Sequence, residues 1–197
     1  MPGTSASYDR VTSADALRPK PAALNSRQLT AELGKARELP ELLCLHQKHG
    51  HLFNDFSINA FWSKFKKLPR GELSGLYECL APVCEQTVRM LPELGARQVA
   101  NVAHAFAKAR LVGTGPWQTV WAALPEAVRR SLGDFDPQHL SNTAWAFATA
   151  GHASPELFVA ISAMAVRQRL DNFNPQGLSN MVWAFATAGH ASPELFD

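Results

Sequence analysis

The sequence contains one stretch of fourteen residues twice. WAFATAGHASPELF runs from Trp145 to Phe158 and again from Trp183 to Phe196, at an offset of 38 residues. Self-similarity at a period of roughly 20 to 50 residues is typical of solenoids and other repeat arrays. The repeat therefore restricts the chain to folds that are built from stacked copies of one supersecondary unit.

Two weaker copies precede the strong ones. In ARQVANVAHAFAKAR, Asn101 matches Asn142 and Asn180 of the two strong copies. In FSINAFWSKFKKL, Asn59 and Trp62 match the asparagine and the tryptophan of those copies. The anchor asparagines are then 42, 41 and 38 residues apart, which indicates four related units.

Each unit has the pattern of two helices. In the last unit, Asn174 is a capping residue, and the proline after it suits the first helical position. Leu178, Val182 and Phe185 then stand at i, i+4 and i+7, which predicts one apolar stripe. Gly189 occupies the position where a helix commonly ends in a left-handed residue.

The third unit begins in the same way at Asp136, and the second helix of its pair begins at Ser154. Glu156 in the first turn of that second helix complements the positive end of the helix dipole. The earlier copies of this second helix contain Pro82 and Pro125, which predict a kink or a break.

The predicted fold is all-α. A helix pair of about 38 residues cannot bury its apolar face alone, whereas stacked pairs share a continuous core. We therefore predict a right-handed superhelical α-solenoid of helix-turn-helix repeats of about 38–42 residues. Trp145, Trp183, Phe147 and Phe185 are interpreted as the core between repeats rather than as a surface for base stacking.

Three segments are expected along the chain. Residues 1–25 are rich in Ser, Thr, Ala and Pro and predict a disordered leader, and Asp9 and Asp15 argue against an organelle transit peptide. Residues 26–52 form a helical lead-in, and 53–197 form the repeats. The last repeat is truncated on this interpretation, and we expect the chain to be a fragment of a longer protein rather than to meet a partner there.

The chemistry of the side chains points away from catalysis. The sequence contains no nucleophile-elbow, P-loop or paired-carboxylate pattern, so no enzymatic activity, cofactor or small-molecule substrate is expected. No run approaches the roughly 18 apolar residues of a membrane span. Three cysteines, Cys44, Cys79 and Cys84, are too few for a disulfide framework.

The segment CLHQKHGH, residues 44–51, gathers one cysteine and three histidines. Thiolate and imidazole are the usual ligands of zinc, but the spacing does not match a zinc finger. We favour a helix C-terminus at which histidines complement the dipole, and we expect no metal site.

The string PQ-x-L-S-N-x-x-W-A-F-A-T-A-G, followed by a Pro-Glu-Leu-Phe helix start, resembles the octotricopeptide repeat. The match is strong over residues 137–197, moderate over 96–132 and loose over 53–91. Residues 26–68 are similar to the N-terminal helical segment of RAP-domain and FAST-kinase-like proteins. The resemblance implies sequence-selective binding of single-stranded organellar transcripts in the chloroplast or mitochondrial matrix. Members of this class support RNA processing, mRNA stability or translation, without catalysis by the repeats.

Helical repeats can present one base-reading surface per unit. Candidate RNA-binding residues are the polar and basic side chains that recur at fixed places in the units or near helix ends. They are Arg97, Gln98, Asn101, Lys108, Arg110, Arg129, Arg130, Gln138, His139, Asn142, Thr143, Arg167, Arg169, Gln176 and Asn180. A structural role is equally open for the asparagines, and for each single basic residue a solvated helix end is the simpler interpretation.

The net charge of +2 is too small to indicate a polyanion partner by itself. The clearest basic cluster is Lys64, Lys66, Lys67 and Arg70, whereas residues 92–197 carry seven Lys and Arg against eight Asp and Glu. A protein–protein interaction scaffold of the same fold is therefore the alternative function, and a truncated RNA-processing enzyme is a third. An RNA-binding array predicts an electropositive concave side.

Overall fold

The computed structural model describes residues 24–69, 75 and 77–196, and all regular secondary structure in these ranges is helical. The α-helices are α1 (Ser26–Lys35), α2 (Leu39–His49), α3 (Asp55–Phe65), α4 (Tyr77–Met90), α5 (Ala96–Lys108), α6 (Gln118–Ser131), α7 (Pro137–Ala150), α8 (Pro155–Gln168), α9 (Pro175–Ala188) and α10 (Pro193–Phe196). The predicted all-α class is confirmed. The expected leader, apart from Leu24 and Asn25, and Arg70 of the basic cluster lie outside the described residues.

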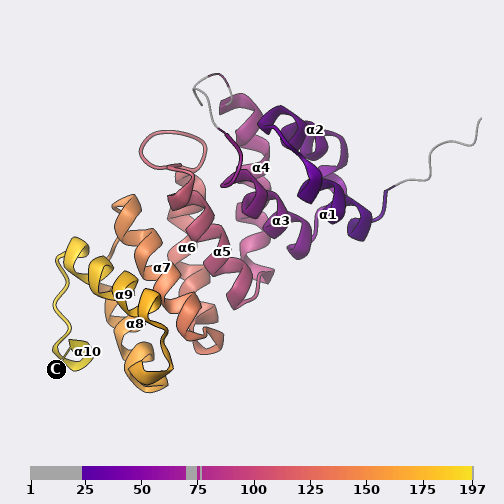
Figure 1. The fold of residues 1–197 in the computed structure, drawn as a ribbon. Coiled ribbons are helices and arrows are strands. Elements are labelled where there is room, and N and C mark those ends of the chain that lie inside the picture. Colours follow the sequence, from indigo (N-terminus) through magenta and orange to yellow (C-terminus); the bar gives the residue numbers. More distant parts are fainter. Residues whose placement is uncertain (1–23, 70–74, 76, 197) are drawn as a thin grey trace, which may run out of the picture.

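The helices form two layers. The odd layer contains α1, α3, α5, α7 and α9, each packed on the next, and the even layer contains α2, α4, α6, α8 and α10. A short 3-10 turn follows each of the first four even helices: Gly50–Leu52, Leu91–Glu93, Leu132–Asp134 and Leu170–Asn172. Successive pairs follow one another from α1 and α2 to α9 and α10 (Figure 1). The chain therefore has a repeat-like architecture in which each hairpin covers part of the preceding one.

Local signals set the helix ends as predicted. The Asp136 and Asn174 side chains each accept a hydrogen bond from the third backbone N–H of the following helix, both at 2.7 Å. The Ser154 hydroxyl oxygen caps α8 in the same way, at 3.2 Å. Gly151 and Gly189 end α7 and α9 with φ of 69° and 64°, in the left-handed region that favours glycine.

Of the kink or break expected at the internal prolines, the break does not occur. Both α4 and α6 run through Pro82 and Pro125 without interruption. Next to each proline lies a fully buried residue, Val83 in α4 and Leu124 in α6. Burial of these side chains in the core holds the helix together across the one backbone hydrogen bond that proline removes.

The caps fix the register of the units. The N-cap residues of α3, α5, α7 and α9 are Asn54, Gly95, Asp136 and Asn174. The anchor asparagines of the last three units lie six positions after their cap, and in α3 that place holds Ala60. The alignment on Asn59 and Trp62 is therefore one position out of register. Trp62 lies in the core, where its Nε1 donates to the Thr87 hydroxyl oxygen at 2.9 Å.

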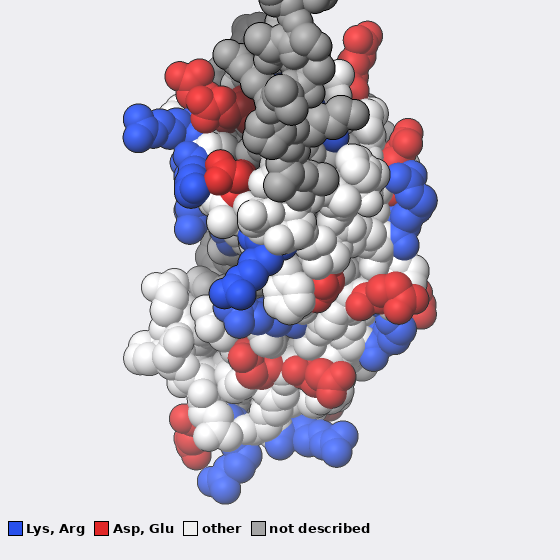
Figure 2. Space-filling view, turned by 90° about the vertical axis from the view of Figure 1, so that its right-hand side faces the viewer, with Lys and Arg blue, Asp and Glu red and all other residues white. Residues whose placement is uncertain are grey.

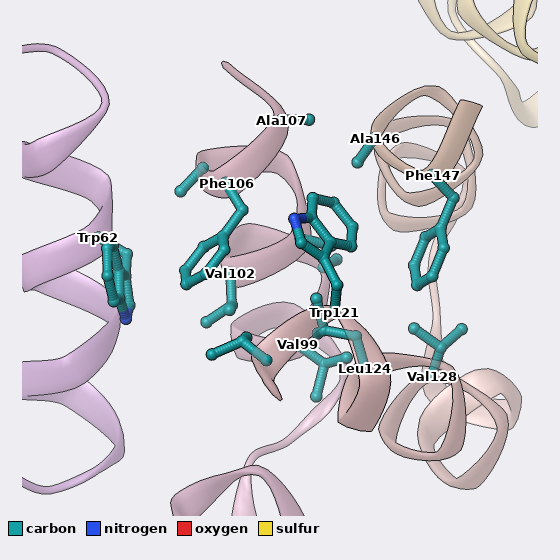
Figure 3. Packing of buried hydrophobic residues seen from close by; sticks show 14 of the residues in the cluster. Trp62, Val99, Val102, Phe106, Ala107, Trp121, Leu124, Val128, Ala146 and Phe147 are labelled. Atoms are coloured by element: carbon teal, nitrogen blue, oxygen red, sulfur yellow. The ribbon is translucent and has the colours of Figure 1, made fainter. Parts of the chain in front are cut away.

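Contacts between aromatic rings connect the cores of successive units. Phe106 lies between Trp62 and Trp121, with ring centroids 4.4 and 6.1 Å apart, and Phe147 follows at 5.4 Å from Trp121 (Figure 3). Trp62, Phe106 and Phe147 lie on the odd helices α3, α5 and α7, and Trp121 lies on the even helix α6, so the ring contacts connect both layers. Phe147 and Phe185 are fully buried, as predicted.

In the described part of the chain, no helix is both long and apolar enough to cross a bilayer.

Candidate functional site

The odd helices share one row of side chains that faces away from the even layer. The aromatic residue eleven positions after each cap points to the even layer, as the contact of Phe106 with Trp121 demonstrates. Positions two, six, nine and thirteen lie on the opposite side of the same helix. We call these positions the outer stripe, and all of its members on α3, α5, α7 and α9 are exposed or half-buried.

The outer stripe consists of four rows across the odd helices. The rows are Phe56, Arg97, Gln138 and Gln176; Ala60, Asn101, Asn142 and Asn180; Ser63, His104, Trp145 and Trp183; and Lys67, Lys108, Thr149 and Thr187. The amides of the first two rows gather on α7 and α9, and the lysines of the fourth row are Lys67, just beyond the end of α3, and Lys108, the last residue of α5. The stripe is therefore polar and uncharged at one end of the layer and basic at the other.

A pocket of about 270 Å³ opens between the N-terminal halves of α7 and α9. Six amide residues line it: Gln138, Asn142, Gln176 and Asn180 of the outer stripe, and Asn172 and Asn174, which precede α9. Gln176 Nε2 donates to Asn180 Oδ1 at 2.9 Å. A primary amide carries two N–H donors and an acceptor oxygen, which is the combination that pairs with the edge of a nucleobase. The pocket can thus offer both donors and acceptors to a planar polar ligand.

At the other end, lysines surround an uncharged histidine. Lys66 Nζ donates to His104 Nδ1 at 3.1 Å. Burial, followed by the charges of Lys66 and Lys108, lowers the pKa of His104 to about 4, so the ring is neutral at pH 7. Burial and the neighbouring Lys67 and Lys108 likewise lower the pKa of Lys66. Positive charge is therefore concentrated at the C-terminal ends of α3 and α5.

The structure brings seven of the predicted residues together. Arg97, Asn101, Lys108, Gln138, Asn142, Gln176 and Asn180 all belong to the outer stripe. They come from three consecutive odd helices and from three of its four rows.

Three other predicted residues lie on the same helices but off the stripe. Gln98 Nε2 donates to Asp55 Oδ2 at 3.3 Å, between α5 and α3. His139 Nδ1 accepts from the Asp136 backbone N–H at 3.2 Å and so helps to cap α7. Thr143 is completely buried, because the position seven residues after the cap faces the core. A direct contact of Thr143 with RNA is therefore incompatible with the fold.

The remaining predicted residues, all arginines, lie on the even layer or in the connections between helices. Arg129 pairs with Glu126, Arg130 Nη2 donates to the Leu91 carbonyl oxygen at 2.6 Å, and Arg169 lies 3.6 Å from Asp171. Arg167 is exposed in the last turn of α8, and Arg110 follows α5 with φ of 51°. The structure does not bring these residues to the outer stripe.

The sequence interpretation missed the third row. Both tryptophans are expected in the core between repeats; Trp145 is half-buried and packs against the core cluster, whereas Trp183 is 45% exposed. They lie two positions before the core phenylalanines, on the other side of the helix. Their spacing of three residues from Asn142 and Asn180 was the available signal, because residues at i and i+3 share a helix face.

Charge on the surface is mixed at the N-terminal end of the molecule. Figure 2 turns the right-hand side of Figure 1, where α1 and α2 lie, toward the viewer, and there Lys and Arg side chains are interspersed with Asp and Glu. This face consequently lacks the single sign of charge that a broad polyanion surface requires.

In the histidine-rich segment, residues 44–51, His46 has a structural role. His46 is buried, its Nε2 lies 2.8 Å from Gln86 Oε1, and its ring packs edge-on against Phe53 and Phe61. Within the described ranges, no group of three or more His, Cys, Asp or Glu side chains is arranged to hold a metal ion.

A scan of the chain against models of known protein families finds no match.

Proposed function

We propose that the chain is an RNA-binding helical-repeat adaptor. It recognises single-stranded RNA along the outer stripe and acts, without a cofactor or catalysis of its own, in the processing, stability or translation of transcripts. The resemblance of the repeats to octotricopeptide units supports the chloroplast or mitochondrial matrix as the site of this role. The observation that carries the proposal is the amide-lined pocket between α7 and α9.

The pocket suits a base because its amides lie on two neighbouring units. Asn142 and Asn180 occupy the same position of successive repeats, and Gln138 and Gln176 occupy another. Reading of exposed bases by a few side chains per repeat is the known mode of helical repeat proteins on single-stranded RNA. Phosphates of the same strand would meet the lysines at the other end of the odd layer.

The stripe becomes a continuous binding track if the hairpins stack as a right-handed superhelix. Such stacking is the α-solenoid geometry that the repeat period predicts. Each unit then presents its outer-stripe residues at a constant displacement from those of the previous unit, which suits a polymer with a regular spacing of bases.

A protein–protein scaffold is the second candidate. Val159 and Val166 are 55% and 42% exposed on the outward side of α8, where the corresponding side of α6 carries Glu126 and Arg129. Exposed apolar side chains on one helix face fit a protein partner better than RNA. The near-balanced charge of residues 92–197 favours this candidate too.

Binding of short single-stranded RNA to the purified chain tests the proposal. Fluorescence anisotropy with a pool of labelled oligonucleotides, at about 50 and 200 mM salt, is expected to detect binding that weakens with salt. The double substitution Asn142→Ala with Asn180→Ala is expected to weaken it by about tenfold or more, the loss of one or two base contacts. Thr119→Ala, at an exposed site on α6, is the control. Absence of binding at both salt concentrations would contradict the proposal and favour the scaffold.

A further inference from the structure

The hydrogen bonds within the amide-lined pocket determine which of its polar groups remain for a ligand. Gln176 Nε2 donates to Asn180 Oδ1 at 2.9 Å, and Asn172 Nδ2 donates to the Gln168 carbonyl oxygen at 2.6 Å. Each bond uses an amide N–H, so the side-chain oxygens of Gln176 and Asn172 remain as acceptors. Because the oxygen of Asn180 is occupied by Gln176, its Nδ2 group is the donor that remains.

A carboxylate lines the same pocket. Asp136 is the N-cap residue of α7, and its side chain is 55% exposed. Its Oδ1 accepts from the His139 backbone N–H at 2.7 Å, which leaves Oδ2 without a hydrogen bond inside the described part of the chain. None of the described residues that line the pocket is a lysine or an arginine. The pocket is therefore negatively charged and rich in acceptors, so it repels a phosphate and favours an uncharged group that donates hydrogen bonds.

The Watson–Crick edge of guanine matches this set of groups. It presents two adjacent donors, N1–H and the N2 amino group, and the acceptor O6 beside them. Adenine and cytosine each present one donor group next to acceptors, and uracil presents one N–H between two acceptors. The two donors of guanine have the arrangement of two N–H groups of an arginine, which a carboxylate accepts in a bidentate, charge-assisted pair. Guanine is therefore the base whose edge gains most from a carboxylate in the pocket.

We propose that the pocket between α7 and α9 is selective for guanine. The Asp136 carboxylate accepts from N1–H and the N2 amino group, and the amides of Asn142 and Asn180 donate to O6. This inference rests on the proposed function, since only a single-stranded RNA offers the Watson–Crick edge of its bases. The pocket volume of about 270 Å³ is below the range of about 300–1,000 Å³ for drug-sized ligands, as a site for one base should be.

The chain itself indicates the substitution that isolates the carboxylate. Asn174 caps α9 as Asp136 caps α7, and its Oδ1 accepts from the Gly177 backbone N–H at 2.7 Å. Asp136→Asn is therefore expected to preserve the cap of α7. An asparagine has one side-chain oxygen, and the cap uses it, so only N–H groups remain for the ligand. The variant thus places donors against the donors of guanine, while the fold is retained.

Binding of short uridine-rich RNAs that differ in one central base tests the inference. In anisotropy titrations, the 197-residue chain is expected to bind the guanosine RNA at least about fivefold more tightly than the adenosine RNA. Asp136→Asn should reduce this ratio to about one. Asp134→Asn, at an exposed acidic residue in the preceding 3-10 turn, removes the same charge and should preserve the ratio. Circular dichroism verifies that both variants fold.

The possible results separate this inference from the proposed function. Equal affinity of the unsubstituted chain for all four bases, or a preference for another base, would overturn guanine selectivity and leave RNA binding intact. No binding of any of the RNAs would overturn both. A guanine preference that survives Asp136→Asn would overturn the role of the carboxylate.

Modified bases test which edge is recognised. Inosine lacks the N2 amino group of guanosine, and 7-deazaguanosine is altered only on the opposite, Hoogsteen edge. Replacement of the central guanosine by inosine should weaken binding about fivefold or more, and replacement by 7-deazaguanosine should leave the affinity unchanged. An unchanged affinity for the inosine RNA, or a loss with 7-deazaguanosine alone, would overturn recognition of the Watson–Crick edge.

Discussion

The imidazole of His104 lies against the indole of Trp145, with ring centroids 5.4 Å apart and ring planes inclined by 59°. The two residues belong to adjacent units, and each lies nine positions after the cap of its helix. Lys66 of the preceding odd helix donates to His104. The contacts of Lys66, His104 and Trp145 thus link the successive odd helices α3, α5 and α7. The stability of this cluster therefore depends on how the hairpins stack.

The cluster predicts a loss of stability in mild acid. The folded His104 has a pKa of about 4, below the ordinary value of 6.5, so the unfolded chain binds more protons between these two values. The stabilisation is complete above pH 6.5 and disappears as the pH falls toward 4. Burial lowers the pKa of His46 and His152 in the same direction. We expect His104 to contribute about 1–2 kcal/mol to this change, after allowance for its partial exposure.

Urea unfolding followed by tryptophan fluorescence at pH 7 and pH 5 measures this loss. His104→Asn is expected to reduce the difference between the two pH values. His51→Asn, a change of an exposed histidine, is the matched control. An unchanged pH difference in His104→Asn would contradict the assignment of the effect to this site.

Two neighbouring aromatic residues of α9 are expected to differ sharply in their contribution to stability. Phe185 is buried, and its ring packs 4.9 Å from that of Phe158, whereas Trp183 is 45% exposed. Phe185→Ala should lower the free energy of unfolding by about 3–5 kcal/mol, and Trp183→Ala by less than about 1.5 kcal/mol. Chemical denaturation of the two variants measures the difference. Similar losses would place both side chains in the core.

The cap of α7 predicts a smaller, local effect. Asp136 Oδ1 accepts from the His139 backbone N–H at 2.7 Å, and the His139 ring returns a contact to the Asp136 backbone. Asp136→Ala is expected to cost about 1 kcal/mol in the free energy of unfolding. Asp134→Ala, at an exposed acidic residue in the preceding 3-10 turn, should change stability little, and equal losses in thermal unfolding would exclude a capping role.

Residues whose roles depend on local chemistry could be predicted from the sequence. Capping by Asp136 and Asn174 and the glycine end of α9 need only the backbone of one helix, and they are confirmed. Burial of Thr143 and exposure of Trp183 depend on which side of the helix meets the next hairpin, and the residue types suggest the reverse assignment. The continuity of α4 across Pro82 likewise follows from tertiary packing, which outweighs the local preference of proline.

The residues of the candidate site could be predicted in part, because their types recur in the sequence whereas their arrangement depends on tertiary packing. Asparagine and glutamine positions recur in the repeat, so Gln138, Asn142, Gln176 and Asn180 could be selected, although their common pocket could not. The arginines near helix ends were selected by charge alone. Charge does not indicate the layer on which a residue lies, so residues such as Arg129 and Arg167 proved to be on even helices.

The position of each basic residue predicts its effect on the salt dependence of RNA binding. Arg97 lies on the outer stripe and Arg167 on the even layer, and both are exposed. Arg97→Ala should lower the slope of log affinity against log salt by about one, the loss of one phosphate contact, and Arg167→Ala should leave it unchanged. Anisotropy titrations at four salt concentrations give both slopes. The reverse result would move the RNA to the even layer.

The central claim is that single-stranded RNA lies along the outer stripe of the odd helices, and nuclear magnetic resonance tests it most directly. Side-chain amide signals of the labelled chain are recorded while single-stranded RNA is added. We predict that the largest shifts fall on Gln138, Asn142, Gln176 and Asn180, with little change at Gln168 on α8. Shifts confined to α8, or no shifts at saturating RNA, would contradict the claim.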